Sequence, residues 1–143
     1  MFRFIIAVVV GYLVMVVLVV ATSSVAFVVP DVAFQKDSFD VTHGWLAYAL
    51  AVGLVAAVAG GFVAARIARR RRAAAILAAL ALIIGLLSAV GNLRRERPTG
   101  SPAGLTTTER ASRMVQPTWY AFTLPFVGAA GVLVGGRCAR REW

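Results

Sequence analysis

Residues 44–65 read GWLAYALAVGLVAAVAGGFVAA, and residues 66–72, which follow directly, read RIARRRR. The first segment carries no charged side chain, and as a helix it would extend about 33 Å. That length matches the roughly 30 Å of hydrocarbon in a lipid bilayer. The second segment places five arginines at the end of the apolar helix. Arginine clusters of this kind mark the ends of membrane spans, so the pair of segments predicts a transmembrane helix.

Three further apolar stretches repeat this pattern, at 4–29, 73–93 and 118–136. The chain has 143 residues, 60% of them hydrophobic, and a mean hydropathy of +0.83. The connections, at 30–43, 66–72 and 94–117, are too short to hold a globular domain. The sequence therefore predicts an all-α, integral membrane four-helix bundle that forms one transmembrane domain over 1–143.

The basic residues predict the orientation of the spans. The formal net charge is +9, but the arginines lie mostly at the ends of apolar segments, and we expect no binding to nucleic acid. With the N-terminus inside, the loop 66–72 becomes cytoplasmic, and 30–43 and 94–117 become outer loops. The positive-inside rule favours this arrangement. Basic residues that are nearly all Arg indicate a bacterial coding sequence, so we expect a multi-pass protein of a bacterial inner membrane with both termini in the cytoplasm.

A weak internal repeat relates the two halves. Gly53, Gly60 and Gly61 recur at the same spacing as Gly128, Gly135 and Gly136, and an Arg-x-Ala-Arg-Arg run follows each set. Duplication of a helical hairpin explains the repeat, and so does chance in a chain rich in Ala, Gly and Arg. The sequence leaves both explanations open.

Small residues mark a packing face on the second and fourth spans. The members of this small-residue face are Ala49, Gly53, Ala57, Gly61 and Ala65, with Gly131 and Gly135 on the fourth span. Without bulky side chains a neighbouring backbone can approach closely, which replaces the hydrophobic driving force that lipid removes. Packing inside the bundle is the first interpretation, and contact with a second subunit is the alternative.

Polar side chains at membrane depth are few: Tyr12, Ser23, Ser24 and Ser88 are the candidates. Serines in membrane helices usually bond a backbone carbonyl, and the alternative is a polar permeation path. Tyr12 needs a partner for its hydroxyl. Pro125 in the fourth span frees the carbonyl of Ala121 and predicts local curvature.

The arginine cluster has two interpretations. It consists of Arg66, Arg69, Arg70, Arg71 and Arg72. Its first role is to set topology, and contact with anionic lipid or an acidic partner is the alternative.

Local signals in the outer loops predict helix starts. Thr42 or Asp40 can cap the second span. Thr106 followed by Glu109 spells a capping box, which predicts a short helix over 107–115.

Two short motifs resemble a group of uncharacterised small bacterial four-span inner-membrane proteins. One is Gly60-Gly61-Phe62-Val63-Ala64-Ala65-Arg66, at the end of the second span, and the other is Pro117-Thr118-Trp119-Tyr120, at the start of the fourth. The resemblance implies the four-span architecture and supplies no activity.

The function predicted from these residues is non-enzymatic. No nucleophile is paired with a base, Cys138 is the single cysteine, and His43 is the single histidine, so we expect no cofactor and no metal. We predict an accessory or scaffold subunit that contacts membrane lipids and associates with other membrane subunits or with itself through the small-residue face. The main alternative is a small oligomeric transporter or channel with a Ser/Thr/Tyr-lined path. A lipid-modifying enzyme that uses Asp40 and His43 is third.

Overall fold

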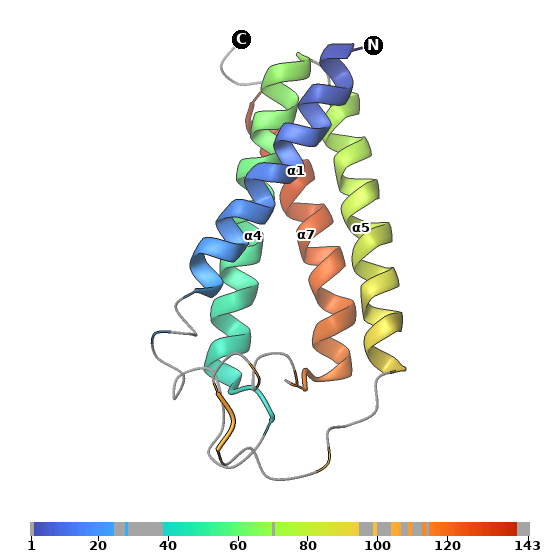
Figure 1. Ribbon diagram of the computed structural model, residues 1–143. Coiled ribbons are helices and arrows are strands. Elements are labelled where there is room, and N and C mark those ends of the chain that lie inside the picture. Colours follow the sequence, from blue (N-terminus) through green and yellow to red (C-terminus); the bar gives the residue numbers. More distant parts are fainter. Residues whose placement is uncertain are drawn as a thin grey trace.

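The computed structural model describes residues 2–24, 28, 39–69, 71–94, 99, 104–106, 109, 113 and 115–139. Within these residues, four helices make up the bundle (Figure 1): α1 (Phe2–Ser23), α4 (His43–Ala68), α5 (Arg71–Leu93) and α7 (Thr118–Cys138). The predicted all-α four-helix bundle is confirmed.

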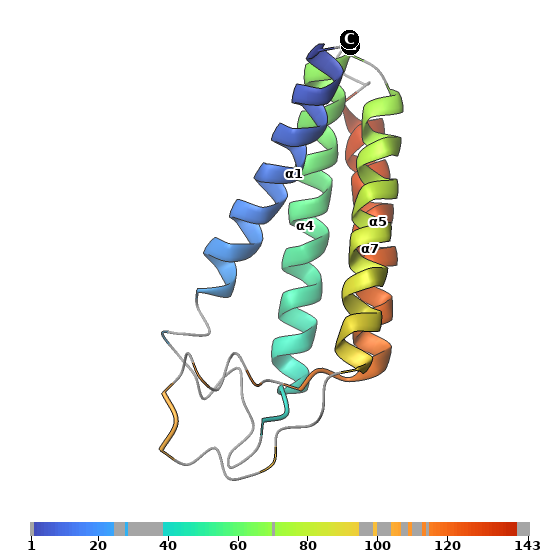
Figure 2. The same ribbon diagram turned by 45° about the vertical axis from the view of Figure 1, so that its right-hand side comes forward.

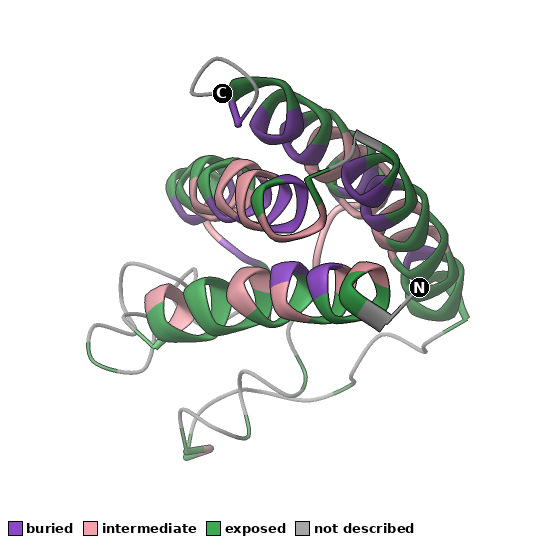
Figure 3. Ribbon diagram, turned by 90° about the horizontal axis from the view of Figure 1, so that it is seen from above, coloured by how far each residue is buried: buried purple, intermediate pink, exposed green. Residues whose placement is uncertain are grey.

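All four helices are long and apolar enough to cross a membrane. Only 11% of the span window in α1 is buried inside the protein, and 28% of each of the other three windows. Figure 3 shows the buried residues on the sides of the helices that face one another, with the exposed residues outside. The outer surface carries large apolar side chains such as Leu87, which is 68% exposed. Lipid is the solvent that suits such a surface, and the chain is a multi-pass membrane protein.

The helices pair as two hairpins. α1 packs mainly against α4, and α5 packs mainly against α7, while α4 and α7 join the two hairpins along the centre. Figure 1 shows the start of α1 and the end of α7 at the end of the bundle where α4 ends and α5 begins. We call this the tight-turn end and the opposite end the long-loop end. This topology is the one that a duplicated hairpin would produce, and the duplication stays a prediction.

α1 ends at Ser23, and residues 25–27 and 29 of the predicted first span lie outside the described part. The clearest difference from the predicted spans is at the tight-turn end. α4 and α5 extend into the predicted loop 66–72, where Arg69 takes the left-handed conformation (φ 52°, ψ 25°) and ends α4. The connection is thus tighter than predicted, because arginine is a good helix former.

Side-chain caps fix the structure at the long-loop end. Thr42 accepts a hydrogen bond from the backbone N–H of Trp45 at 3.2 Å, as predicted for the start of α4. The predicted capping box is confirmed as well, since the Thr106 N–H donates to Glu109 at 2.8 Å and the Glu109 N–H donates to Thr106 at 3.3 Å.

The two long loops meet at Val115, which donates its N–H to the Phe39 carbonyl at 3.0 Å in an isolated bridge. The predicted helix over 107–115 is therefore wrong at its last residue, because tertiary pairing takes the Val115 backbone. Residues 107, 108, 110–112 and 114 lie outside the described part.

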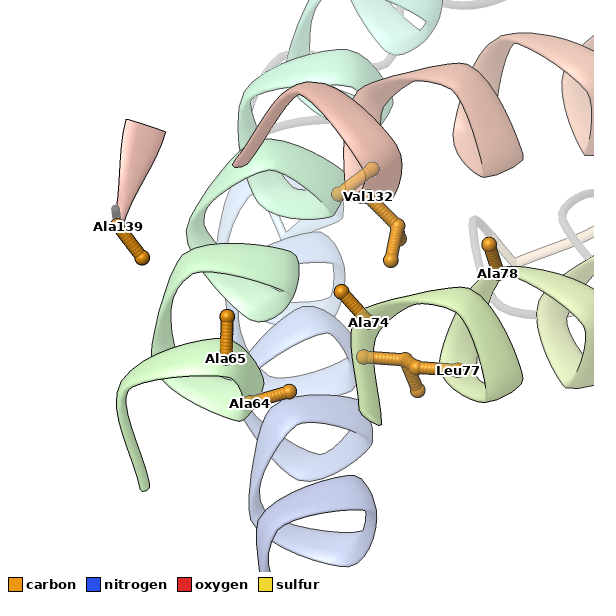
Figure 4. Packing of buried hydrophobic residues seen from close by; sticks show 8 residues of the cluster. Ala64, Ala65, Ala74, Leu77, Ala78, Val132 and Ala139 are labelled. Carbon is orange, nitrogen blue, oxygen red and sulfur yellow. The ribbon is translucent and has the colours of Figure 1, made fainter. Parts of the chain in front are cut away.

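The core is densest at the tight-turn end. Figure 4 shows small side chains of three helices around Leu77 of α5 and Val132 of α7, both 0% exposed. The surrounding cluster is mostly alanine: Ala57, Ala64, Ala65, Ala74, Ala78 and Ala139. At the long-loop end a second cluster is built from larger side chains, including Trp45, Leu46 and Tyr120. Residue size therefore increases along the bundle from one end to the other.

Candidate functional site

The predicted small-residue face of α4 lies against α7 of the same chain. A Cβ at Gly61 would stand 2.7 Å from Cα of Val132, and one at Gly131 would stand 2.9 Å from Cβ of Ala57. A Cβ at Gly135 would stand 2.9 Å from the backbone nitrogen of Phe62. At these three glycines no larger side chain would fit between α4 and α7, so the two central helices are in direct contact along this face. Packing inside the bundle, the first interpretation, is what the structure contains.

The other residues of this face are more buried near the tight-turn end than near the long-loop end. Ala57 and Ala65 are buried in the core, whereas Ala49 and Gly53 are only partly buried. A Cβ at Gly53 would meet only Cδ1 of Leu124, at 3.7 Å. The contact between α4 and α7 therefore loosens toward the long-loop end.

Glycines also place the two outer helices. A Cβ at Gly11 of α1 would stand 2.8 Å from the Gly60 carbonyl oxygen on α4. On the other side, a Cβ at Gly85 of α5 would stand 2.7 Å from the ring of Pro125 on α7. Pro125, predicted to curve its helix, is thus seated against a glycine. Figure 2 shows that α1 leans away from the bundle toward the long-loop end.

A cavity of about 490 Å³ opens in the long-loop half, with walls from all four helices. Its lining lies between Tyr12 and Ser23 on α1, between Trp45 and Gly53 on α4, between Ala81 and Asn92 on α5, and between Tyr120 and Gly128 on α7. The ranges on α1 and α5 each cover eleven residue steps, which is about 16 Å of helix. The cavity therefore runs from the long-loop end to about the middle of α1 and α5. The alanine-rich core occupies the other half.

Three of the four predicted intramembrane polar residues line this cavity: Tyr12, Ser23 and Ser88. Within the described part of the chain, their hydroxyls have no hydrogen-bond partner. Ser24 differs, because it bonds the Val20 carbonyl at 2.9 Å and does not line the cavity. The structure thus divides the predicted set into three cavity residues and one residue that bonds its own helix.

Two further polar residues lie at the mouth of the cavity: Asn92, which the sequence places near the outer boundary of its span, and Gln116, which sequence reasoning missed. Both lie next to the ends of helices, where polar residues are common and give little signal. Pro125 also lines the cavity, together with Ala121. Because proline has no N–H, the Ala121 carbonyl lacks the donor that normally comes from four residues on. The mouth and one wall therefore carry hydrogen-bonding groups on an otherwise apolar surface.

No match was found. Neither protein-family models, nor curated proteins, nor solved structures gave a similarity to this chain.

The arginine cluster lies at the tight-turn end, far from the cavity. The Arg66 guanidinium stacks over the Phe62 ring, 5.6 Å from its centroid. Arg69 and Arg72 are exposed, whereas Arg70 and the Arg71 side chain lie outside the described part. Part of the charge at this end is therefore anchored on the protein surface, and part faces outward.

Proposed function

We propose that this protein is a non-enzymatic component of a bacterial inner membrane that serves as an accessory or scaffold subunit of a larger assembly, with both termini in the cytoplasm. The charge distribution supports the orientation. Arg3, Arg66, Arg69, Arg72 and Arg137 gather at the tight-turn end, while Arg94 and Arg113 are the described arginines at the other end. Positive charge favours the cytoplasmic side.

The contact between α4 and α7 carries the scaffold proposal. Secondary transporters work by rocking one group of helices against another. Here the central helices meet through Gly61 and Gly135, where a single added methyl would collide with backbone. Such close packing fixes the register of the two helices, because sliding would drive larger side chains into the gap. A bundle locked in this way suits a rigid support for other subunits.

The locked contact also changes where a partner would bind. The small-residue face is covered by α7, so we propose that partner subunits contact the outward surfaces and the exposed arginines of the tight-turn end. Arg69 and Arg72 would meet anionic lipid headgroups or acidic segments there, at about 1 kcal/mol per charge near an anionic surface.

Extraction in mild detergent, followed by sizing and mass spectrometry of the full chain, tests this proposal. We expect other membrane proteins to co-purify at fixed stoichiometry. Arg69→Gln with Arg72→Gln should weaken that association, and the matched pair Arg94→Gln with Arg113→Gln at the opposite end should not. A chain that always travels alone would contradict the accessory role.

A small transporter or channel is the second candidate, favoured by the three unpartnered hydroxyls in one cavity. In that case Tyr12→Phe and Ser88→Ala should reduce proton or potassium flux into proteoliposomes. Ser24→Ala is the matched control, since that hydroxyl bonds its own helix outside the cavity. For the scaffold, none of the three variants should change ion flux.

A further inference from the structure

We infer that the cavity binds the acyl chain of one lipid from the leaflet at the long-loop end, with the polar end of that lipid held at the mouth. This site goes beyond the scaffold role and does not depend on it. Its volume of about 490 Å³ falls within the roughly 300–1,000 Å³ of typical small-molecule sites.

The dimensions of the cavity match one leaflet. Its walls run about 16 Å along α1 and α5, and half of the roughly 30 Å hydrocarbon layer is about 15 Å. A chain that enters from the long-loop end would therefore reach the Tyr12 level at about mid-membrane. The core around Leu77 and Val132 closes the cavity beyond that depth.

The lining is mostly apolar inside and polar at the mouth, which matches the apolar chain and polar end of a lipid. The inner wall is mostly apolar, with Met15, Ile84 and Leu124 among its members and the hydroxyls of Tyr12 and Ser88 as exceptions, whereas Ser23, Asn92 and Gln116 surround the mouth. Within the described part these three mouth residues make no hydrogen bond to protein. The ester and headgroup oxygens of a lipid offer acceptors at this level for the amide and hydroxyl donors of these residues.

The space is accessible to lipid, because α1 packs only slightly on α5 and stands away from it in this half (Figures 1 and 2). A hydrocarbon chain both fits and gains the contacts that an empty space would lose.

Trp45 provides the test, because it is 9% exposed and lines the cavity, whereas Trp119 is 56% exposed on the outer surface. The full chain is placed in phosphatidylglycerol vesicles whose acyl chains carry bromine, a contact quencher of tryptophan fluorescence. Variants that each keep a single tryptophan, Trp45 or Trp119, give the quenching of each side chain separately. We expect bromine to quench Trp45 to an extent comparable with Trp119, although Trp45 is buried from bulk lipid.

Gly128→Leu closes the cavity from within, since Gly128 lines it and an added Cβ would meet nothing within 4 Å. Gly91→Leu is the matched control, because its Cβ is equally free but lies outside the lining. We expect Gly128→Leu to remove most of the Trp45 quenching and Gly91→Leu to retain it. Gly53→Leu is a second filling variant should Gly128→Leu fail to fold.

Either of two results would overturn the site. One is an unquenched Trp45 beside a quenched Trp119, which would mean that water or another part of the chain fills the cavity. The other is equal quenching of Trp45 in wild type and in both filling variants, which would mean that bulk lipid reaches it directly. Native mass spectrometry should agree, with one lipid retained per wild-type chain and none per folded Gly128→Leu chain. The scaffold role can fail in the co-purification experiment while this test succeeds.

Discussion

Gly61→Ala is the sharpest test of the packing described above, because it adds one methyl where α4 meets the backbone of α7. The new Cβ would stand 2.7 Å from Cα of Val132 and 2.8 Å from its carbonyl carbon. Ordinary van der Waals contact begins at 3.4 Å. Val132 Cα must therefore move by at least about 0.7 Å, and the Val132 carbonyl oxygen, which lies nearer still, must move further. Because backbone cannot rotate away as a side chain can, the whole crossing must open.

The cost follows from the contacts that such an opening weakens. A gap of 0.5–1 Å forfeits a quarter to a half of each contact, and each contact contributes about 0.1–0.2 kcal/mol. For about 40 contacts around the crossing, the loss is about 1–4 kcal/mol, in agreement with the 1–3 kcal/mol typical of overpacked cores. A central value of about 2 kcal/mol lowers the folding equilibrium constant about 30-fold.

Gly53→Ala is the matched control on the same face of the same helix. Its Cβ would meet only Cδ1 of Leu124, at 3.7 Å. Both variants gain the helix propensity of alanine, about 1 kcal/mol, so the difference between them isolates the collision. Unfolding in mixed micelles with increasing SDS, followed by circular dichroism, measures that difference. If Gly61→Ala proves as stable as Gly53→Ala, the close contact between α4 and α7 is refuted.

Three further predictions concern the ends of the bundle. An impermeant maleimide should leave Cys138 unmodified in intact cells and a permeant one should label it; labelling by both would place the C-terminus outside. Thr42→Ala should lower the free energy of unfolding by about 1 kcal/mol, because it removes the cap of α4; an unchanged midpoint in SDS would contradict this role. Hydrogen bonds from Thr106 hold the pKa of Glu109 below its usual value, so the capping box should be stable above pH of about 4.5 and be lost as the pH falls through the lowered pKa. The protection of the Thr106 amide proton, taken as its exchange rate relative to the intrinsic rate at each pH, measures this loss. Glu109→Gln should abolish the pH dependence of that protection.

Most of the fold could be predicted from the sequence because each span carries its own signal. An apolar run of about 20 residues has to be helical in lipid, and the four runs are separated by clear breaks. The bounds were less predictable. At Arg69 a left-handed residue ends α4 inside what looked like a longer loop, and hydropathy carries no signal of that conformation.

The candidate site was predictable only in its parts. The small residues at Gly61 and Gly135 indicated close packing, but which helix covers which face depends on tertiary pairing. Adjacent serines show the limit best. Ser23 and Ser24 are equivalent in composition and depth, yet they point about 100° apart around the helix axis, so one lines the cavity and the other bonds the Val20 carbonyl.

The cavity itself follows from a gradient in residue size along the bundle. At the tight-turn end, glycine and alanine let the helices meet at backbone distance, as at Gly11 with Gly60. At the long-loop end, the larger side chains of Trp45 and Tyr120 belong to one buried cluster, and the contact between α4 and α7 is looser, since a Cβ at Gly53 would meet only Cδ1 of Leu124. Straight helices that converge at one end diverge at the other, and α1 leans away from the bundle toward the long-loop end (Figure 2). The same close contacts that lock the core therefore create an open, half-membrane space. A variant such as Gly11→Leu, which moves the crossing of α1 over α4, should change both the stability of the bundle and the quenching of Trp45 by lipid. If the close contacts and the cavity were independent, the variant would change stability and leave the quenching of Trp45 as it is.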